Sequence, residues 1–200
     1  MKSDITDKTL SYYNTQSSQF TGGTLDVEFS AIQDWFLSYL SPGASVLDLG
    51  CGSGRDTRYF LQKGYAAEAC DGSEEMVRIA SETAGIPVRK MLFNELEDVD
   101  KYDGIFACAS ILHVPYAELP DILQRMHRAL KLEGIAYVSF KYGTFEGYRN
   151  DRYFTDLNEE RFQALLDMTG GFVILEEKIT SDARKGRENE KWLNVILRKS

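Results

Sequence analysis

Apolar residues along this 200-residue chain recur at two spacings, one typical of buried strands and the other of helices. Short apolar runs predict strands over residues 46–49, 65–70, 87–93, 102–108, 135–140, 172–179 and 192–197. Apolar residues three or four positions apart predict helices over 25–40, 74–84 and 119–130, and from 156 to about 168. Helices therefore separate most of the strands, as in α/β proteins with a largely parallel sheet.

The order of these elements predicts one domain over residues 1–200, with a Rossmann-like, doubly wound sheet of seven strands and helices on both faces. The sheet is expected to be mostly parallel with an antiparallel last strand, because only the charged stretch 180–191 separates the final two strands. Residues 144–155 are polar and aromatic without a period, so we expect a loop there. The stretch 6–20 has a weaker helical signal, which Gly22 and Gly23 end.

The stretch from Ser45 to Phe60 predicts a strand, a glycine turn and the start of a helix. Gly50, Gly52 and Gly54 form a G-x-G-x-G loop directly after the apolar strand. Glycines at this spacing let the backbone adopt positive φ and let a ligand approach the main chain closely. In doubly wound sheets, ligands bind beside such loops at the carboxyl ends of the strands.

Two acids near this loop narrow the class of ligand. A dinucleotide site favours G-x-G-x-x-G, whereas here the third glycine comes one residue early. Asp48, just before the turn, is a poor neighbour for a pyrophosphate and a good one for a cationic ligand. Asp71, at the end of the next strand, can accept hydrogen bonds from both hydroxyls of a ribose. A nucleoside with a positive centre and no phosphate fits these features, and S-adenosylmethionine is the common one.

Three segments then resemble class I S-adenosylmethionine-dependent methyltransferases: Val-Leu-Asp-Leu-Gly-Cys-Gly-Ser-Gly at 46–54, Cys-Asp-Gly-Ser-Glu-Glu-Met at 70–76, and 102–114. The Gly-Arg-Asp after the loop and the small size are similar to the bacterial tellurite-resistance and ubiquinone-biosynthesis types. The likeness extends over roughly residues 12–198, and the loop, the spaced acid and the later strands in order make it specific. It implies S-adenosylmethionine as the methyl donor, S-adenosylhomocysteine as the product, and no metal.

The resemblance and the common edge of the parallel strands predict where the cofactor binds. The expected cofactor-binding residues are Tyr13, Asp48, Gly50, Cys51, Gly52, Gly54, Asp71, Gly72, Met76, Phe93, Asn94, Cys108 and Ala109. Many relatives have an acid for the adenine amino group where this chain has Phe93 and Asn94, so we expect Asn94 to accept that hydrogen bond and Phe93 to pack on the ring.

The resembled family also implies that the N-terminal segment, residues 1–24, folds over the cofactor as a lid. Tyr13, or Tyr12 in its place, would then touch the methionine end of the cofactor. The alternative is that both tyrosines only cover a hydrophobic edge.

The acceptor side of the same edge is expected to contain Lys141, Tyr142, Arg184 and Arg187, within a locally basic set that also includes Arg149, Arg152 and Lys185. These residues would recognise a small acceptor, and their cations favour an anionic one, although ordinary exposed charge explains each cation equally well. His113 follows the fourth strand and is the candidate for a catalytic base. The alternative is a histidine at a helix start that is bonded to the backbone before Pro115.

Composition limits the other possibilities. A net charge of -8 and a sequence pI near 4.9 argue against a broad nucleic-acid surface. The sequence has neither a run of eighteen apolar residues nor an apolar leader, so we expect a cytoplasmic protein without a membrane partner. Three cysteines without a C-x-x-C pair predict neither a disulfide framework nor a zinc site.

Several functions therefore stay open beside a small-molecule methyltransferase. A module that binds S-adenosylmethionine or S-adenosylhomocysteine without turnover would share the whole cofactor edge. An RNA methyltransferase is disfavoured by the acidic balance and by Ala109-Ser-Ile-Leu, which stands where adenine-N6 enzymes have an Asn/Asp-Pro-Pro-aromatic signature. The glycine spacing argues against a nucleotide-dependent dehydrogenase. The acceptor atom and the choice between monomer and homodimer are not determined by the sequence.

Overall fold

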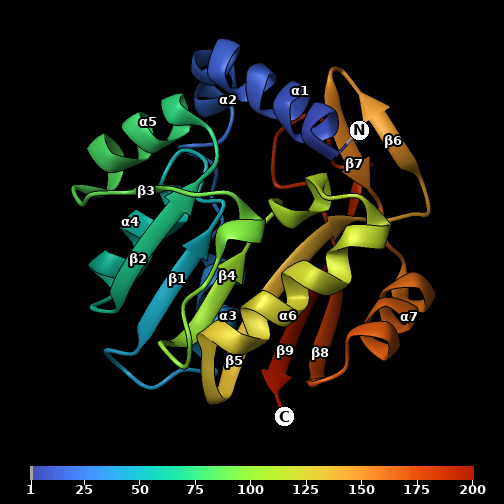
Figure 1. Cartoon of the computed structure of the whole chain (residues 1–200). Coiled ribbons are helices and arrows are strands. Elements are labelled where there is room, and N and C mark those ends of the chain that lie inside the picture. The colour runs from blue at the N-terminus through green and yellow to red at the C-terminus, as the bar shows by residue number, and fades with distance from the viewer. Residues whose placement is uncertain (1) are drawn as a thin grey trace.

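The computed structural model describes residues 2–200, and within them all side chains except those of residues 2, 3 and 18–20. Its main sheet has the strand order β3-β2-β1-β4-β5-β9-β8 (Figure 1). The strands are β1 (Ser45–Leu49), β2 (Ala66–Asp71), β3 (Arg89–Lys90), β4 (Tyr102–Ala107), β5 (Leu130–Lys141), β8 (Phe172–Ser181) and β9 (Lys191–Lys199).

The strand directions confirm the expected fold class. Strands β1 to β5 pair in parallel with their neighbours, and β9 is antiparallel to both β5 and β8. Strand β9 therefore runs against the other six. The carboxyl ends of those six meet at one edge of the sheet, where a doubly wound fold binds its ligands.

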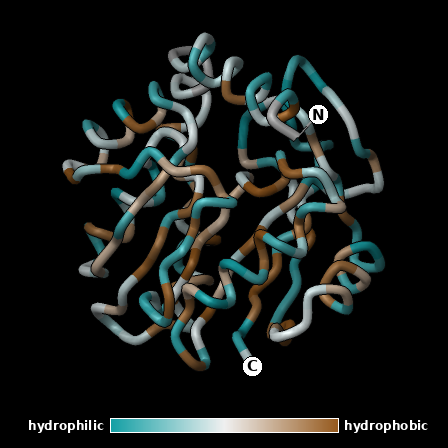
Figure 2. Tube along the Cα trace, in the orientation of Figure 1, coloured by the Kyte–Doolittle hydropathy of each residue, from teal (hydrophilic) through white to brown (hydrophobic). Residues whose placement is uncertain are grey.

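Helices cover both faces of the sheet, as the apolar periodicity predicts. The helices α3 (Ser30–Leu37) and α4 (Arg55–Gln62) bury Phe36 and Phe60 against Phe106 of β4. On the opposite face, α6 (Leu119–Ala129) and α7 (Glu159–Thr169) pack with their apolar stripes on β4, β5 and β9. Figure 2 shows the hydrophobic positions concentrated along the central strands and the inner sides of the helices. The apolar clusters on the two faces of the sheet therefore hold the strand ends in fixed positions.

Helix α5 (Glu74–Ala84) has sequence signals at both ends. The Ser73 side chain accepts a hydrogen bond from the Met76 N–H as the N-cap, and two glutamates occupy the first turn. Gly85 ends the helix in the left-handed conformation, with φ of 72°. The predicted span 74–84 is therefore confirmed, and Asp71 is fixed three residues before the helix begins.

The carboxyl edge of the sheet is covered by two segments that lie far apart in the sequence. Helices α1 (Lys2–Thr15) and α2 (Ser17–Gly22) lie above it, next to a separate hairpin of β6 (Glu146–Arg149) and β7 (Arg152–Thr155) (Figure 1). Helix α1 contacts both β7 and α5. It therefore spans the edge from one side of the molecule to the other.

Three local predictions are wrong. Residues 144–155, expected as a loop, contain the β6–β7 hairpin, in which Asn150 and Asp151 both have positive φ, as a type I′ turn requires. The third strand has two residues instead of seven, because Phe93–Glu95 turns into a 3-10 helix. The helix expected over 25–40 begins only at Ser30, because the Thr24 and Leu25 N–H groups bond back to Thr21 and turn the chain first.

Candidate active site

A cavity of about 290 Å³ lies at the carboxyl edge of the sheet, beneath α1 and the β6–β7 hairpin. All but three of the site residues that the sequence predicts line it. Those that line it are Tyr13, Gly50, Cys51, Gly52, Asp71, Gly72, Met76, Phe93, Asn94, Cys108, Ala109, His113, Lys141, Arg184 and Arg187. The fold therefore brings together residues from the ends of six strands and from the N-terminal helix.

The glycine loop passes close to its neighbours, and side chains would not fit there. Gly50 has φ of 79°, and a Cβ there would come within 2.5 Å of the Ser110 Cβ. Gly52 also has positive φ, at 53°. A Cβ on Gly72 would come within 2.9 Å of Leu92. The loop thus leaves bare main chain facing the cavity, as close approach of a ligand requires.

Asp71 lines the cavity at the end of β2 with both carboxylate oxygens anchored. Oδ2 accepts the Gly52 N–H at 3.0 Å, and Oδ1 accepts the Ser73 N–H at 2.8 Å. Burial raises the pKa of Asp71, while these backbone N–H bonds lower it. A carboxylate oxygen has two lone pairs, so each oxygen can accept one further bond, and two adjacent hydroxyls are donors of matching geometry.

Three predicted site residues lie outside the cavity. Asp48 is 1% exposed and accepts a hydrogen bond from the Thr57 hydroxyl at 2.6 Å, and burial raises its pKa well above the ordinary range. It therefore supports the loop from behind and does not face a cationic ligand. A Cβ on Gly54 would meet the Ala80 backbone at 2.9 Å, so this glycine lets α4 and α5 pack closely. Tyr142 is 40% exposed and donates its hydroxyl to Glu159.

His113 and Tyr13 meet across the cavity. The His113 Nδ1 lies 2.6 Å from the Tyr153 carbonyl, which can only accept, so Nδ1 carries the proton. The other ring nitrogen, Nε2, is then an acceptor and receives the Tyr13 hydroxyl at 2.8 Å. Burial lowers the pKa of His113 to about 4; the bond to the Tyr153 carbonyl raises it by less, and the charge of Arg152 adds a smaller lowering. His113 is therefore a neutral imidazole at pH 7, held in one tautomer.

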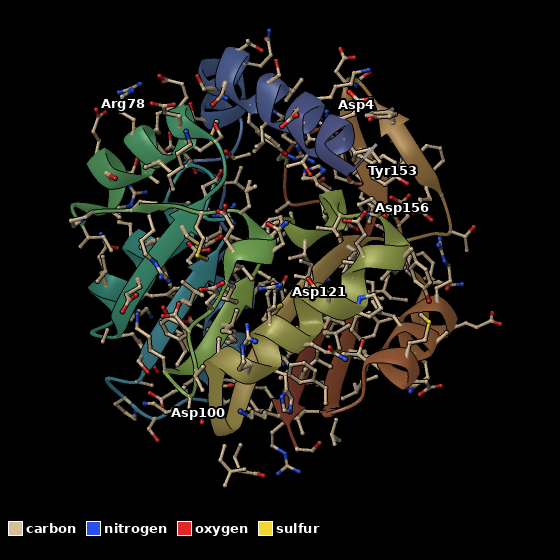
Figure 3. All side chains as sticks on the ribbon, in the orientation of Figure 1. Asp4, Arg78, Asp100, Asp121, Tyr153 and Asp156 are labelled. Atoms are coloured by element: carbon tan, nitrogen blue, oxygen red, sulfur yellow. The ribbon has the colours of Figure 1, made fainter. Side chains whose placement is uncertain are left out.

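Helix α1 is tied to both sides of the cavity. Asn14 Oδ1 accepts the Ser73 hydroxyl at 2.7 Å, which joins α1 to the start of α5. On the other side, Thr9 Oγ1 accepts the Tyr153 N–H at 3.2 Å, which joins α1 to the hairpin. Figure 3 labels Tyr153 at this junction. These bonds, together with the Tyr13–His113 bond, hold α1 over the cavity as a roof.

The cations predicted on the acceptor side are paired with acids. Arg184 donates from Nε to Asp182 at 2.8 Å and holds the pKa of that buried carboxyl at about 2, against the raising effect of burial. Lys141 pairs with Glu190, and Arg187 lies 3.6 Å from the same carboxylate. The positive charges of Arg184, Lys141 and Arg187 are therefore largely neutralised within the protein. An anionic ligand would have to compete with Asp182 and Glu190 to bind them.

Several cavity residues were missed by the sequence prediction. Phe154 enters the cavity from β7 beside Arg152, which the sequence placed in the basic acceptor-side set, and the centre of the Phe29 ring lies 4.3 Å from the Arg55 guanidinium. The signal for β7 is present in the sequence, since Arg152-Tyr-Phe-Thr pairs with Glu146-Gly-Tyr-Arg across a two-residue Asn-Asp turn. Phe29 was instead assigned to the apolar stripe of a longer helix.

The part of the chain that the structure describes contains neither a cluster of metal ligands nor a membrane-spanning helix. Within residues 2–200, no group of three or more His, Cys, Asp or Glu side chains is placed to hold a metal ion. None of the helices described there is long and apolar enough to cross a membrane.

The strand order, the glycine loop after β1 and the acid at the end of β2 define a Rossmann-like methyltransferase fold. A solved structure of 1,6-didemethyltoxoflavin-N1-methyltransferase from Burkholderia thailandensis has this fold, with a TM-score of 0.83 and 20% identity over 100% of this chain and 91% of that one. That protein was solved with 1,6-didemethyltoxoflavin and S-adenosylhomocysteine bound.

Sequence comparisons agree with the fold. Residues 46–134 match a family model described as a methyltransferase domain. An uncharacterized methyltransferase of Staphylococcus carnosus is 27% identical over 155 residues, which cover 72% of this chain and 74% of the relative. Another, of Synechocystis sp., is 30% identical over 100 residues, and that match spans 48% of this chain and 46% of the relative, less than half of either. Over residues 46–134 the chain thus resembles methyltransferase domains in sequence, and its fold is that of methyltransferases solved with S-adenosylhomocysteine bound.

Proposed function

We propose that this protein transfers the methyl group of S-adenosylmethionine to a small acceptor. The observation that carries the proposal is Asp71 beside the bare glycine loop, in a roofed cavity at the carboxyl edge of the sheet. The roof supports a small-molecule acceptor, because α1 and the hairpin close the edge that a macromolecule would need to approach. The bound ligand described for the Burkholderia relative is also a small heterocycle.

The residues at the β1, β2 and β3 ends fit the cofactor. Gly50, Gly52 and Gly72 leave space at the main chain, and Asp71 offers free lone pairs to two ribose hydroxyls. Phe93 and Asn94 line the next strand end and would contact the adenine. When bound, the cofactor supplies an activated sulfonium methyl group, so the protein has to align the acceptor and exclude water.

Tyr13 and His113 are proposed to receive the acceptor proton. The Tyr13 hydroxyl donates to His113 Nε2, and a bound acceptor would donate its N–H or O–H to the Tyr13 oxygen in competition with the long 3.4 Å bond from Arg152 Nη1. A proton passed to Tyr13 moves the tyrosine proton on to Nε2, while Nδ1 stays bonded to the Tyr153 carbonyl. With a pKa of about 4, His113 is unprotonated and ready at pH 7, although it is a weak base.

The first test measures cofactor binding by isothermal titration calorimetry. We expect S-adenosylhomocysteine to bind and NAD not to bind. Asp71→Asn should weaken S-adenosylhomocysteine binding by about 10- to 100-fold, since hydrogen bonds to a charged group contribute roughly 1.5–3 kcal/mol. The matched control is Asp121→Asn, an acid on α6 that is 58% exposed and is labelled in Figure 3. Binding of NAD in place of S-adenosylhomocysteine would refute the proposal.

A further inference from the structure

We propose, building on the methyl-transfer function, that the acceptor carries a carboxylate or phosphate group that binds Arg152. Arg152 lines the cavity from the first position of β7, and the sequence analysis placed it only within the basic set of the acceptor side. The anion would lie between β7 and α1, and the methylated atom would face Tyr13.

The distribution of charge in the cavity carries this inference. Four other cations line the cavity, and each has an acidic partner in the structure: Arg55 with Asp56, Lys141 with Glu190, Arg184 with Asp182 and Arg187 with Glu190. Among the described side chains, Arg152 has no carboxylate within ion-pair distance. A partly buried guanidinium without a counterion is costly, because burial weakens its hydration and no partner replaces it.

The hydrogen bonds of Arg152 are also largely unused. Its Nη1 donates to the Tyr13 hydroxyl at a long 3.4 Å, and its buried Nε has no partner in the structure. A guanidinium has five N–H groups in a planar fork that fits carboxylate and phosphate oxygens in pairs. Most of the N–H groups of the Arg152 guanidinium therefore have no acceptor among the described residues and could bind the oxygens of an anion.

Aromatic rings fix the guanidinium in place. It lies 4.4 Å from the centre of the Tyr12 ring and 5.2 Å from that of Phe154. Rings at these distances attract a cation without neutralising its charge. Arg152 is thus held in one orientation before any ligand arrives, which lowers the entropy cost of binding.

The position of Arg152 links anion binding to the proposed reaction. Tyr13 connects the two, because its hydroxyl contacts Arg152 on one side and His113 on the other. The charge of Arg152 also disfavours a proton on His113. An anion on Arg152 would offset that charge, so an anionic acceptor would make His113 a better base at the moment when it must receive a proton.

The test uses the full chain with methyl-tritiated S-adenosylmethionine and a bacterial metabolite extract. Anion exchange divides the extract into retained and unretained fractions. We expect label to enter the retained fraction. Loss of labelling after alkaline phosphatase treatment would identify a phosphate, and loss after carbodiimide amidation a carboxylate.

Variants then test Arg152 on the unmethylated acceptor, purified from the extract fraction in which labelling was found. Arg152→Gln should lower kcat/KM by about 10- to 100-fold, mainly through KM, as for loss of a charged hydrogen bond. Arg152→Lys should recover part of the loss. The matched control, Arg78→Gln, removes an arginine that is 54% exposed on α5 and labelled in Figure 3, and should change kcat/KM less than about twofold.

The affinity for S-adenosylhomocysteine separates this role from the others. It should stay within about threefold of wild type in Arg152→Gln, which also reports that the roof is intact. An equal loss of cofactor affinity would instead assign Arg152 to the methionine carboxylate and overturn the inference. Labelling confined to the unretained fraction would overturn it while leaving methyl transfer established. No labelling of any fraction by a protein that binds S-adenosylhomocysteine would refute both proposals.

Discussion

At the scale of single residues, Gly50 has two separate reasons to be glycine. Its φ of 79° disfavours any side chain, and a Cβ would also meet Ser110. Gly64 has a similar φ of 85°, but a Cβ there would meet no atom within 4 Å. A substitution at Gly64 therefore measures the backbone strain alone. The two positions can therefore be compared directly.

We expect Gly64→Ala to lower the free energy of unfolding by about 1–2 kcal/mol, the strain of a left-handed alanine. Gly50→Ala should cost roughly 1–3 kcal/mol more, because the clash with Ser110 overpacks the site. Urea unfolding at pH 7 measures both. Gly50→Ala should also lose S-adenosylhomocysteine affinity, whereas Gly64→Ala should keep it. Equal effects of the two substitutions would show that the close approach at Gly50 has no energetic consequence.

His113 should give the protein a pH-dependent stability. Its pKa falls from an unfolded value near 6.5 to about 4 in the folded protein, so the unfolded chain binds a proton first as the pH falls. This contribution to stability is complete above about pH 6.5 and is lost progressively down to about pH 4. At pH 5 the loss should be roughly 2 kcal/mol relative to pH 7.

The measurement compares wild type with His113→Gln by urea unfolding at both pH values. Wild type should lose more stability between pH 7 and 5 than the variant does. In the methyl-transfer assay, kcat of the wild type should not fall between pH 8 and about 5.5, because His113 is already unprotonated throughout. A fall in kcat centred near pH 6.5 would contradict the lowered pKa.

The two acids at the loop show where sequence reasoning at this scale stops. Asp71 and Asp48 both stand at strand ends near the glycines, and the sequence assigns both to the ligand. In the structure, Asp71 faces the cavity and Asp48 points to Thr57 behind the loop. The face to which a strand-end side chain turns depends on the twist of the loop and on the packing of α4, which the sequence pattern does not describe.

At the scale of elements, α1 connects the two sides of the site. Asn14 accepts hydrogen bonds from the Ser73 hydroxyl and, at 3.4 Å, from the Glu75 N–H. Asn14→Ala removes both while leaving the cavity lining in place, since Asn14 is not part of that lining. This substitution therefore tests the attachment of the roof alone.

We expect Asn14→Ala to raise hydrogen–deuterium exchange in α1 by about 5-fold or more, the effect of a hydrogen bond worth about 1 kcal/mol. S-adenosylhomocysteine should slow exchange there in both proteins, and should leave faster from the variant. The control is Thr15→Ala, because the Thr15 hydroxyl bonds only within α1, to Ser11 and Tyr12. If Thr15→Ala had the same effect, general loosening of the helix would explain the result.

Sequence reasoning predicted the long elements well and the short ones poorly. The strands of the central sheet and the helices α5 and α6 have strong periodic patterns, and their positions were predicted within a few residues. The β6–β7 hairpin has four residues in each strand, and its Asn150–Asp151 turn lacks the glycine that marks most such turns. Without the hairpin, the sequence could place Arg152 only within a group of acceptor-side cations, because a cation in a predicted loop has no predicted direction.

At the scale of the whole molecule, the strand directions follow from the sequence through chain connectivity. Each parallel pair is joined by a helix or longer crossover, and β8 and β9 are joined by a short loop. The division of the cavity into a cofactor side and an acceptor side cannot be predicted from chain connectivity. It depends on α1 and the hairpin, which are 136 residues apart from Thr15 to Asp151 in the chain and meet only in the fold.

The shared roof has a consequence for the order of events in the proposed reaction. Helix α1 is hydrogen-bonded both to the start of α5, on the cofactor side, and to the hairpin, on the acceptor side. Cofactor and acceptor would therefore enter and leave through the same opening, and either set of hydrogen bonds would keep α1 closed over both ligands. The rate of turnover would then be limited by the opening of α1 and the release of S-adenosylhomocysteine, more than by the methyl-transfer step itself.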